Sequence, residues 1–514
     1  MPIPREFWRD WRAPMLAAFV AVAAALPGLR FPFLSDDWAL IEAVSTGLTH
    51  ATPYGDFRPL YMSTLWLEYL FFGLTPFFYH LTNILLIAST AALVVILIRL
   101  YTGDTPLAAL SGVLYALHPY HVENTAWISA RSDPLYAVFY LGAAVAHHRW
   151  LANGSRGLPL ATMLLFQAAL FSKETALTLP AFLTLMGLLH QFRGLRLRSW
   201  MRSYLLLWIQ LGLHFLLRFL ALGGAGRTLA DGSVGTWAKN GLAYAAAALI
   251  PAPTEVLTAS PAFWGIVATV ISGLMILLAF IRNGRIPPPA VGATIAFAIL
   301  LGPSVVGLQE RYILLPSAAS ALILASLIRS LRGHIRAIIS TGLIVFWLFM
   351  LQIHWGNWRQ AAEASDLLIA DLTELSRRPE IQEIVVANMP FQVRGGSVAG
   401  DLRAALALRG ERPVNVRAAC YVSYATADTD VLNGPLEHSI DREPSFTEVR
   451  LRIPIETYSR VIGPTPPPGE RFLETSIAWL RFEDEGRIRI QIKPGPEDQR
   501  IAVVWSGGRL QPLF

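Results

Sequence analysis

Long apolar runs are the feature that most constrains how this 514-residue chain can fold. A helix needs roughly 20 consecutive apolar residues to cross the hydrocarbon core of a bilayer, and eleven segments approach that length. Only 15% of the residues are charged and 54% are hydrophobic, whereas an ordinary soluble domain is about 25% charged. The sequence therefore predicts a polytopic α-helical membrane protein with about eleven transmembrane helices. The predicted spans are residues 13–29, 78–99, 106–119, 134–150, 157–172, 175–191, 203–221, 262–281, 289–307, 312–329 and 335–354.

Basic residues are distributed unevenly between the predicted loops. The net charge is +6, and only three of the basic residues are lysines: Lys173, Lys239 and Lys493. The N-terminal segment and the loops of one side contain fifteen basic residues, whereas the loops of the other side contain seven. Since cytoplasmic loops are enriched in Lys and Arg, we expect the N-terminus inside and, after eleven spans, the C-terminus outside. The charge excess therefore indicates membrane orientation, and we expect no nucleic-acid partner.

Two segments of the membrane part depart from a simple span. Residues 240–258 are apolar but contain Pro251 and Pro253, which favours a half-helix or re-entrant piece over a full span. Residues 58–74 are amphipathic, and we expect them to form a helix that lies at the membrane interface.

The composition changes after Trp358, where charged residues become frequent. Short runs alternate there between apolar and polar residues, a pattern typical of strands. We predict a transmembrane domain in residues 1–355 and a C-terminal soluble α/β or α+β domain in residues 356–514. The single cysteine, Cys420, excludes an internal disulfide and a cysteine-rich metal site. The expected strands lie at residues 448–455, 476–482, 487–492 and 501–505.

Ionisable residues gather in the loops of the predicted outer face. An unpaired charge near lipid is costly, so such groups are candidates for a functional site. The inner loops carry mostly arginine and glycine, which makes the outer face the expected location of the site. Five segments carry the polar residues of this face: 35–38, 56–61, 118–134, 172–175 and 309–312.

Two adjacent acids, Asp36 and Asp37, follow the first predicted span. One interpretation is a solvated loop that caps a helix starting at Trp38. The other is a catalytic pair, in which one carboxylate faces a cavity while the other caps the helix. Because Trp38 opens an apolar stretch, Asp37 is the expected N-cap, with its carboxylate engaged by backbone N–H groups. Asp36 is then the expected general base.

The segment 118–134 carries the largest group of polar side chains. His118 and His121 have the spacing of a metal pair, but a proline lies between them and no third ligand follows at a telling spacing. We therefore favour a polar cleft that binds a sugar or an acceptor, and we assign no metal ligands. The residues assigned to sugar or acceptor binding are Asp56, Arg58, His118, His121, Glu123, Arg131, Asp133, Glu174 and Tyr312.

Three basic residues are candidates for a phosphate contact. Lys173 is a lysine retained between apolar stretches of an arginine-rich chain, and Arg311 lies at a helix start. Arg218 follows His214 by one helical turn near the outer end of the seventh span, where it needs a carboxylate or a phosphate as partner. The structural alternatives are local pairing of Lys173 with Glu174 and snorkelling of Arg311 to lipid headgroups.

The motifs "SDD", "FRPL", "HPYHVENTAWISARSD", "SKE" and "ERYILLPS" together resemble the membrane glycosyltransferases of the C-type fold. They are most similar to the protein O-mannosyltransferases of the branch that carries tetratricopeptide repeats, over roughly residues 10–350. The resemblance implies about eleven spans, an acid pair in the first outer loop that serves the active site, and a polyprenyl-phosphate sugar donor. The chain departs from this family in its C-terminal part, where alternating strands replace the repeats. The resemblance therefore leaves the acceptor open between a protein and an envelope glycan.

These features lead to an expected reaction. A direct displacement would invert the anomeric centre, with Asp36 accepting the proton of the acceptor hydroxyl and Asp37 ordering the loop or contacting the acceptor. Lys173, Arg311 and Arg218 would hold the leaving phosphate. The sequence indicates no certain cofactor, and a divalent cation, Mg²⁺ or Mn²⁺, stays open. We expect an integral protein of a bacterial or archaeal cell membrane, with the active site and the C-terminal domain on the extracytoplasmic side.

Two other functions remain as alternatives to glycosyl transfer. A transporter or flippase of lipid-linked sugars would show internal repeats and ionisable groups near mid-membrane, whereas the charges of this chain cluster at one face. An envelope-assembly membrane protein would use its outer domain as the working part, and eleven spans exceed what an anchor needs. Glycosyl transfer is therefore the favoured function.

Overall fold

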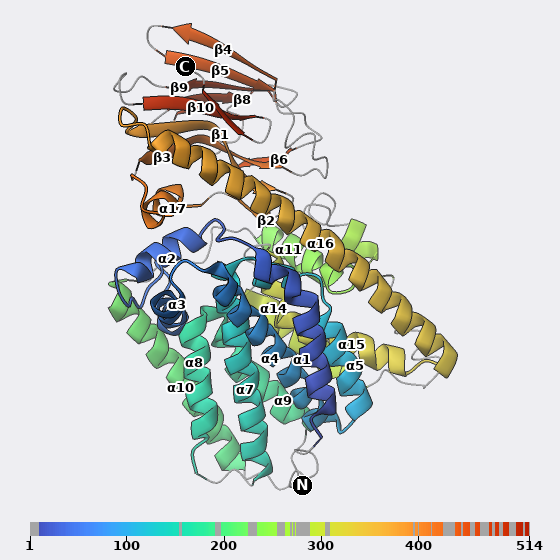
Figure 1. Cartoon of the computed structure of the whole chain (residues 1–514). Helices are drawn as coiled ribbons and strands as arrows, with labels where there is room; N and C mark the ends of the chain where they lie inside the picture. Colours follow the sequence, from blue (N-terminus) through green and yellow to red (C-terminus); the bar gives the residue numbers. More distant parts are fainter. Residues whose placement is uncertain are drawn as a thin grey trace. The chain divides into compact units, whose positions relative to one another are not determined.

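A computed structural model of the chain provides the structure described below. The chain divides into two compact units, which we call the helical unit (residues 1–30 and 43–354) and the sheet unit (residues 31–42 and 355–514) (Figure 1). The described residues are 10–153, 157–190, 197–224, 234–253, 263–267, 270, 273, 288–303, 309–393, 396–398, 400–412, 414–424, 437–443, 446–452, 458–462, 472–474, 478–482, 487–492, 500–506 and 509–512.

The helical unit consists of apolar α-helices and short 3-10 helices (Figure 1). Helices α2 (Asp37–Ser45) and α16 (Gly333–Ser376) contribute residues to both units. The other described helices of this unit are α1 (Arg12–Ala25), η2 (Leu26–Arg30), α3 (Pro59–Phe72), α4 (Pro76–Thr102), α5 (Thr105–Ala116), α6 (His121–Ala126), η3 (Ile128–Arg131), α7 (Ser132–Ala152), α8 (Leu160–Ser172), η4 (Glu174–Thr178), α9 (Leu179–His190), α10 (Leu197–Leu222), α11 (Val234–Ala247), α14 (Pro288–Leu301), η6 (Glu310–Ile313) and α15 (Pro316–Arg329).

The helices agree well in position with the predicted spans. Every predicted span other than 262–281 corresponds to a described helix, and 262–281 lies mostly outside the described residues. Among the residues that the structure describes, four helices are long and apolar enough to cross a membrane, and five further apolar helices are 10–17 residues long. The chain therefore has the helices of a membrane protein, while the number of eleven spans stays a prediction. The stretches long and apolar enough to cross a membrane, by length and composition, are Arg12–Arg30, Pro76–Thr102, Met201–Leu222 and Gly333–Ser376.

Helix α4 packs against α1, α5 and α7 within a common hydrophobic core. Helix α5 approaches its neighbours closely at Gly112, where an added Cβ would lie 2.2 Å from Val95 Cγ2 on α4 and 3.0 Å from Ala17 Cβ on α1. Small residues allow such close packing of membrane helices, for which dispersion contacts supply much of the stability. This packing fixes the ends of α4, α5 and α7, from which the polar segments emerge.

The sheet unit contains two β-sheets (Figure 1). The first sheet has the order β11-β10-β1-β3-β6, with β2 paired to β1, and its β1–β10 and β1–β3 pairs are parallel. The second sheet is antiparallel with the order β4-β5-β9-β8-β7. The strands are β1 (Glu383–Val393), β2 (Gly396–Ser397), β3 (Asn415–Tyr424), β4 (Glu437–Glu443), β5 (Phe446–Arg452), β6 (Tyr458–Ile462), β7 (Phe472–Glu474), β8 (Ala478–Phe482), β9 (Arg487–Ile492), β10 (Arg500–Ser506) and β11 (Arg509–Pro512).

The four segments predicted as strands all contain strands, namely β5, β8, β9 and β10. The central strand β1 was not among them, because it does not alternate. Ile384, Val385 and Val386 are all fully buried, as is usual for a parallel strand covered on both faces. The Asn388 side chain crosslinks β1 to β10, since its Nδ2 donates to the Trp505 carbonyl and its Oδ1 accepts from the Trp505 N–H.

The two irregular segments of the membrane part are helical over part of their length. Helix α3 (Pro59–Phe72) occupies most of the predicted interfacial segment 58–74. Helix α11 begins before the predicted piece 240–258 and ends at Ala247, followed by a turn, and the residues beyond 253 lie outside the described residues. With 14 residues, α11 is too short to span a bilayer, for which about 20 are needed.

Candidate active site

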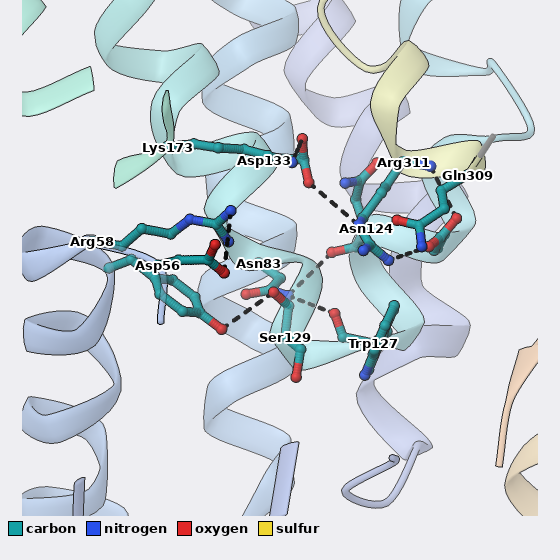
Figure 2. Close-up of polar contacts among 12 residues, drawn as sticks. Asp56, Arg58, Asn83, Asn124, Trp127, Ser129, Asp133, Lys173, Gln309 and Arg311 are labelled. Atoms are coloured by element: carbon teal, nitrogen blue, oxygen red, sulfur yellow. Dashed lines mark hydrogen bonds and ion pairs between the residues drawn. The ribbon is translucent and has the colours of Figure 1, made fainter. Parts of the chain in front are cut away.

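The carboxylate of Asp133 is the point where three of the predicted polar segments meet (Figure 2). Asp133 lies in the first turn of α7, with 1% of its surface exposed. Its Oδ1 lies 2.5 Å from Nζ of Lys173, and its Oδ2 lies 3.7 Å from Nε of Arg311. The segments 118–134, 172–175 and 309–312 therefore converge in space, although they are distant in the sequence.

Arg311 makes a second ion pair with Glu123 from helix α6. Its Nη1 lies 2.7 Å from Oε1 of Glu123, and its backbone N–H donates to Oε2 over 2.9 Å. Burial raises the pKa of the Glu123 carboxyl, an effect that the neighbouring Arg311 opposes. The Arg311 guanidinium also lies 4.5 Å from the Trp127 ring and 5.1 Å from the Tyr312 ring, and Nζ of Lys173 lies 4.4 Å from the Tyr312 ring. Both cations are thus held by carboxylates and aromatic faces together.

A third cation, Arg58, pairs with Glu174 next to Lys173 in the chain. Nε and Nη2 of Arg58 lie 3.1 and 2.7 Å from the two Glu174 carboxylate oxygens, and Nη2 lies 3.6 Å from Oδ2 of Asp56. Burial alone would raise the pKa of Glu174, but Arg58 outweighs it and lowers the pKa to about 2. The bidentate geometry is the strong form of this contact. It joins the segment before α3 to the first residue of η4.

These contacts form two sets of ion pairs that adjoin where Lys173 precedes Glu174 in the chain, and we call them together the seven-residue network. Four carboxylates face three cations, so the fully ionised network has one negative charge in excess. Each cation already has at least one carboxylate partner within 3 Å. Lys173 and Arg311 are therefore not isolated cations, and Lys173 pairs with Asp133 instead of with its neighbour Glu174. The members are Asp56, Arg58, Glu123, Asp133, Lys173, Glu174 and Arg311.

Arg131, which the sequence assigns to sugar or acceptor binding, makes no ion pair with this network among the described residues. Its surface is completely buried. It pairs with Glu68 of α3 and donates to Oδ1 of Asn83 over 2.7 Å and to the Tyr79 carbonyl over 2.9 Å. Asn83 in turn donates to the backbone carbonyls of α6 and Trp127 (Figure 2). Arg131 thus holds α3 and α4 to the loop after α6, and a ligand cannot reach it without rearrangement.

His118 and His121, which the sequence also assigns to sugar or acceptor binding, are buried. Their rings lie 5.4 Å apart, and Nε2 of His121 lies 3.0 Å from Oγ of Ser317 on α15. The His118 ring packs on edge against Trp347 of α16. Among the described residues, no group of three or more His, Cys, Asp or Glu side chains is arranged to hold a metal ion.

Arg218 differs from the cations of the network in its surroundings. It is buried in α10 with 8% of its surface exposed. No carboxylate pairs with it among the residues that the structure describes. His214, one turn earlier, lies 3.2 Å from Nε2 of Gln167 through its Nδ1 and packs near the ring of Phe57. Because Phe57 precedes Arg58, this end of α10 lies close to the network.

The acid pair belongs to the sheet unit, where Asp37 is the first residue of α2. The carboxylate of Asp37 is buried and accepts a 2.9 Å hydrogen bond from the backbone N–H of Leu34, three residues earlier. A backbone N–H group therefore engages the carboxylate, as the sequence predicts, although it comes from the loop before the helix, and the helix begins at Asp37 instead of Trp38. The two acids differ in burial, because Asp36 is half-buried and is therefore more accessible than the buried Asp37.

Several residues of this region were not predicted from the sequence. Glu68 is the only charged residue of α3, and a charge inside an apolar helix needs a partner, so its pairing was detectable in principle. His354 of α16 bridges Glu310 and the Pro251 carbonyl through its two ring nitrogens, at 2.9 and 3.0 Å. Nothing in the local sequence of these segments indicates that contact.

The class of protein that the chain resembles is the protein O-mannosyltransferases, as its motifs predict. No family model matches the chain. It is 36% identical over 133 residues to protein O-mannosyl-transferase Tmtc1 of Drosophila melanogaster. This match covers 26% of this chain and 16% of the relative. Tmtc2 of the same organism is 35% identical over 178 residues, covering 32% and 18%. Human TMTC1 is 30% identical over 162 residues, covering 28% and 17%. The matches thus span less than a fifth of these relatives.

The solved structures that match the chain include one that covers most of it. It is the crystal structure of ArnT from Cupriavidus metallidurans bound to undecaprenyl phosphate. The identity is 12% and the TM-score is 0.47, with 93% of this chain and 97% of that chain covered.

Proposed function

We propose that the protein is an inverting glycosyltransferase, which moves a sugar from a polyprenyl-phosphate donor to an acceptor hydroxyl. The observation that carries the proposal is the convergence of carboxylates and cations from separate loops at the ends of apolar helices. Charged groups beside lipid are costly, so a cluster of them that is retained there is a candidate functional site. The similarity to protein O-mannosyltransferases supports transfer of a hexose such as mannose, and the acceptor is a protein or an envelope glycan.

Arg218 is the cation best suited to hold the donor phosphate. It is buried and has no carboxylate partner among the described residues, so its charge is available to an anionic ligand. The sugar–phosphate bond breaks as negative charge grows on the leaving phosphate, and a fixed guanidinium stabilises that charge. Lys173 is already paired with Asp133, and Arg311 is already paired with Glu123. Either cation would therefore have to bind the phosphate and its carboxylate at the same time.

Asp36 is the proposed general base, and Asp37 orders its loop. The acceptor oxygen attacks the anomeric carbon while the bond from that carbon to the phosphate oxygen breaks. The hydroxyl proton moves to the Asp36 carboxylate, the bonding pair stays on the phosphate oxygen, and polyprenyl phosphate leaves. A single displacement of this kind inverts the anomeric centre and requires no covalent intermediate. The buried Asp37 carboxylate, bonded to Leu34 N–H, is suited to ordering the loop.

The remaining proposed contacts lie on the seven-residue network. Asp56, Arg58 and Glu174 form its partly exposed end, and their side chains are 13–23% exposed. Hydroxyl groups of a sugar or acceptor can bond to such charged groups without removing their ion pairs. Tyr312 contributes a ring that Lys173 and Arg311 already face.

A purified sample in lipid nanodiscs tests the reaction directly. Polyprenyl-phosphomannose and acceptor membranes from the source cells are added, and the release of polyprenyl phosphate is followed by mass spectrometry. General-base loss typically costs about 10²–10⁴ in rate, so Asp36→Asn should abolish release in a folded protein while Asp37→Asn retains part of it. Equal activity of wild type and Asp36→Asn would contradict the assignment of the base. No release by wild type from mannosyl, glucosyl or pentosyl donors would contradict glycosyl transfer.

The fold and orientation are part of the proposal: a C-type glycosyltransferase fold with eleven spans, and with residues 356–514 outside the membrane on the extracytoplasmic side. Thr46 is exposed in the loop after α2, and Asn153 is exposed at the other end of α7. In a Cys420→Ser background, Thr46→Cys should react with a membrane-impermeant thiol reagent in intact cells. Asn153→Cys should react only after permeabilisation. The opposite labelling pattern would reverse the proposed orientation.

A further inference from the structure

The sheet unit contains a close contact between two loops that are far apart in the sequence. The acid-pair loop (residues 31–42) meets the segment that precedes helix α17 (Leu402–Leu408) at Gly400. An added Cβ at Gly400 would lie 2.3 Å from the carbonyl carbon of Ser35, 2.5 Å from its oxygen and 2.8 Å from the backbone nitrogen of Asp36. The obstacle is backbone and cannot rotate away, so only glycine fits this contact.

Two arginines, Arg403 within α17 and Arg409 directly after it, extend the contact along the acid-pair loop and helix α2. Nη2 of Arg403 lies 2.9 Å from Oε2 of Glu42. The guanidinium of Arg409 lies 5.3 Å from the centre of the Trp38 ring, within the range of a cation–π contact. The acid pair is therefore held at its start by Gly400 and beyond its end by Arg403 and Arg409.

The backbone of the acid-pair loop needs such support. Ser35 has φ +48°, in the left-handed region that residues other than glycine, asparagine and aspartate rarely adopt. A conformation of this kind persists where the surroundings determine it. Gly400 contacts the carbonyl group of that residue and the amide nitrogen of the next. The direction in which the Asp36 side chain leaves the backbone thus depends on the segment around Gly400.

We propose that Gly400 and helix α17 position the acid pair for catalysis, with Gly400 as the positioning residue. The C-terminal domain is then a working part of the enzyme, because it sets the conformation of the loop that carries the base. This inference rests on the proposed function of Asp36. It assigns a role to residues 400–409, which lie in the part of the chain where the resemblance to O-mannosyltransferases with repeats ends.

The test compares Gly400→Ala with Gly356→Ala. Gly356 lies in the same unit, on α16, and an added Cβ there would meet nothing within 4 Å. Two measurements are made on each protein in nanodiscs: hydrogen exchange of residues 31–42, and turnover and KM in the donor assay. Displacement of a catalytic group by about 1 Å costs on the order of a hundredfold in rate. Gly400→Ala should lower kcat by that order and leave the donor KM within about twofold of wild type.

Hydrogen exchange separates this inference from the proposed function. Gly400→Ala should speed exchange in residues 31–42 and leave strand β1 and the Gly356→Ala protein unchanged. Unchanged exchange in residues 31–42 would overturn the contact itself, whether or not the protein is an enzyme. Faster exchange with unchanged kcat would overturn the positioning role. A wild type without transferase activity would overturn the proposed function and not the exchange result.

A charge exchange provides a second variant that does not depend on the fit at Gly400. Arg403→Glu places two carboxylates together and should raise exchange in residues 31–42, with a loss of up to about fivefold in kcat because the pair is partly exposed. Adding Glu42→Arg restores the opposite charges and should restore both readouts. If the double variant is no better than Arg403→Glu, the Arg403–Glu42 pair does not hold the loop.

Discussion

Arg218 and the seven-residue network are two solutions to the same problem, a basic side chain buried among apolar helices. The cations of the network are neutralised by carboxylates on neighbouring segments, at 2.5–2.7 Å for the shortest contact of each. Arg218 is buried as well, and the residues that the structure describes offer it no carboxylate. We therefore propose that the network stabilises the arrangement of loops and that Arg218 binds the anion that comes with the donor.

The energetics support this division. Removing one partner of a buried ion pair leaves an uncompensated charge and costs about 3–5 kcal/mol, so the network's charges are tied to the fold. An unpaired cation among apolar helices carries a cost of its own, which a bound phosphate would offset. Substitutions in the two regions should therefore affect different quantities.

The largest effect is expected at Arg218. Arg218→Ala removes the proposed phosphate contact and should lower kcat/KM for the donor by roughly 10²–10³, while the unfolding temperature stays close to that of wild type. Donor kinetics and thermal unfolding in nanodiscs measure both. The control is Arg202→Ala on the same helix, where the side chain is exposed and activity should be unchanged. Similar losses in both variants would remove the distinction between Arg218 and other arginines of α10.

The next effect is expected in the network and concerns stability. Lys173→Met leaves the buried Asp133 with only the 3.7 Å contact to Arg311 and should cost about 3 kcal/mol of unfolding free energy. Adding Asp133→Asn to Lys173→Met removes the excess charge and should recover part of the loss. Unfolding monitored by tryptophan fluorescence provides the measurement. A Lys173→Met protein with wild-type stability and a raised donor KM would instead make Lys173 a phosphate contact.

The smallest effect is expected at the exposed end of the network. Arg58→Lys replaces a bidentate contact with Glu174 by a single one and should cost about 1 kcal/mol. Because the pKa of Glu174 is lowered to about 2, the stability from its charged form is complete above the ordinary pKa of a glutamate and is lost as the pH falls through that range toward 2. The cost should therefore be the same at pH 6 and pH 8. A cost that disappears at pH 6 would show that Glu174 titrates near neutrality.

The sequence was sufficient to predict the convergence of the polar loops but not their partners. The segments around Asp133, Lys173 and Arg311 all follow or precede apolar runs on one predicted side, so their meeting follows from topology. Which acid Lys173 selects depends on the rotation and packing of α7 and α8, and adjacency in the chain suggested Glu174 instead. The same limit applies to Arg131, whose burial against Glu68 depends on how α3 docks.

The acid-pair loop shows a second limit of sequence reasoning. The pattern around Asp37 predicted a helix start, and a helix does begin there. The hydrogen bond that the Asp37 carboxylate accepts comes from Leu34 N–H in the loop before the helix, where Ser35 has a left-handed backbone. That loop contacts Gly400, more than 360 residues later, and no local pattern contains this information.

Direct binding of polyprenyl phosphate tests the central claim, that Arg218 and not the network receives the donor phosphate. Its affinity and that of the uncharged polyprenol are measured by titration of wild type, Arg218→Ala and the Lys173→Met/Asp133→Asn protein in nanodiscs. A charge-assisted contact is worth about 1.5–3 kcal/mol, so wild type should prefer the phosphate by roughly 10–100-fold. We expect the network variant to keep this preference and Arg218→Ala to lose it. Loss of the preference in the network variant, with Arg218→Ala unchanged, would contradict the claim.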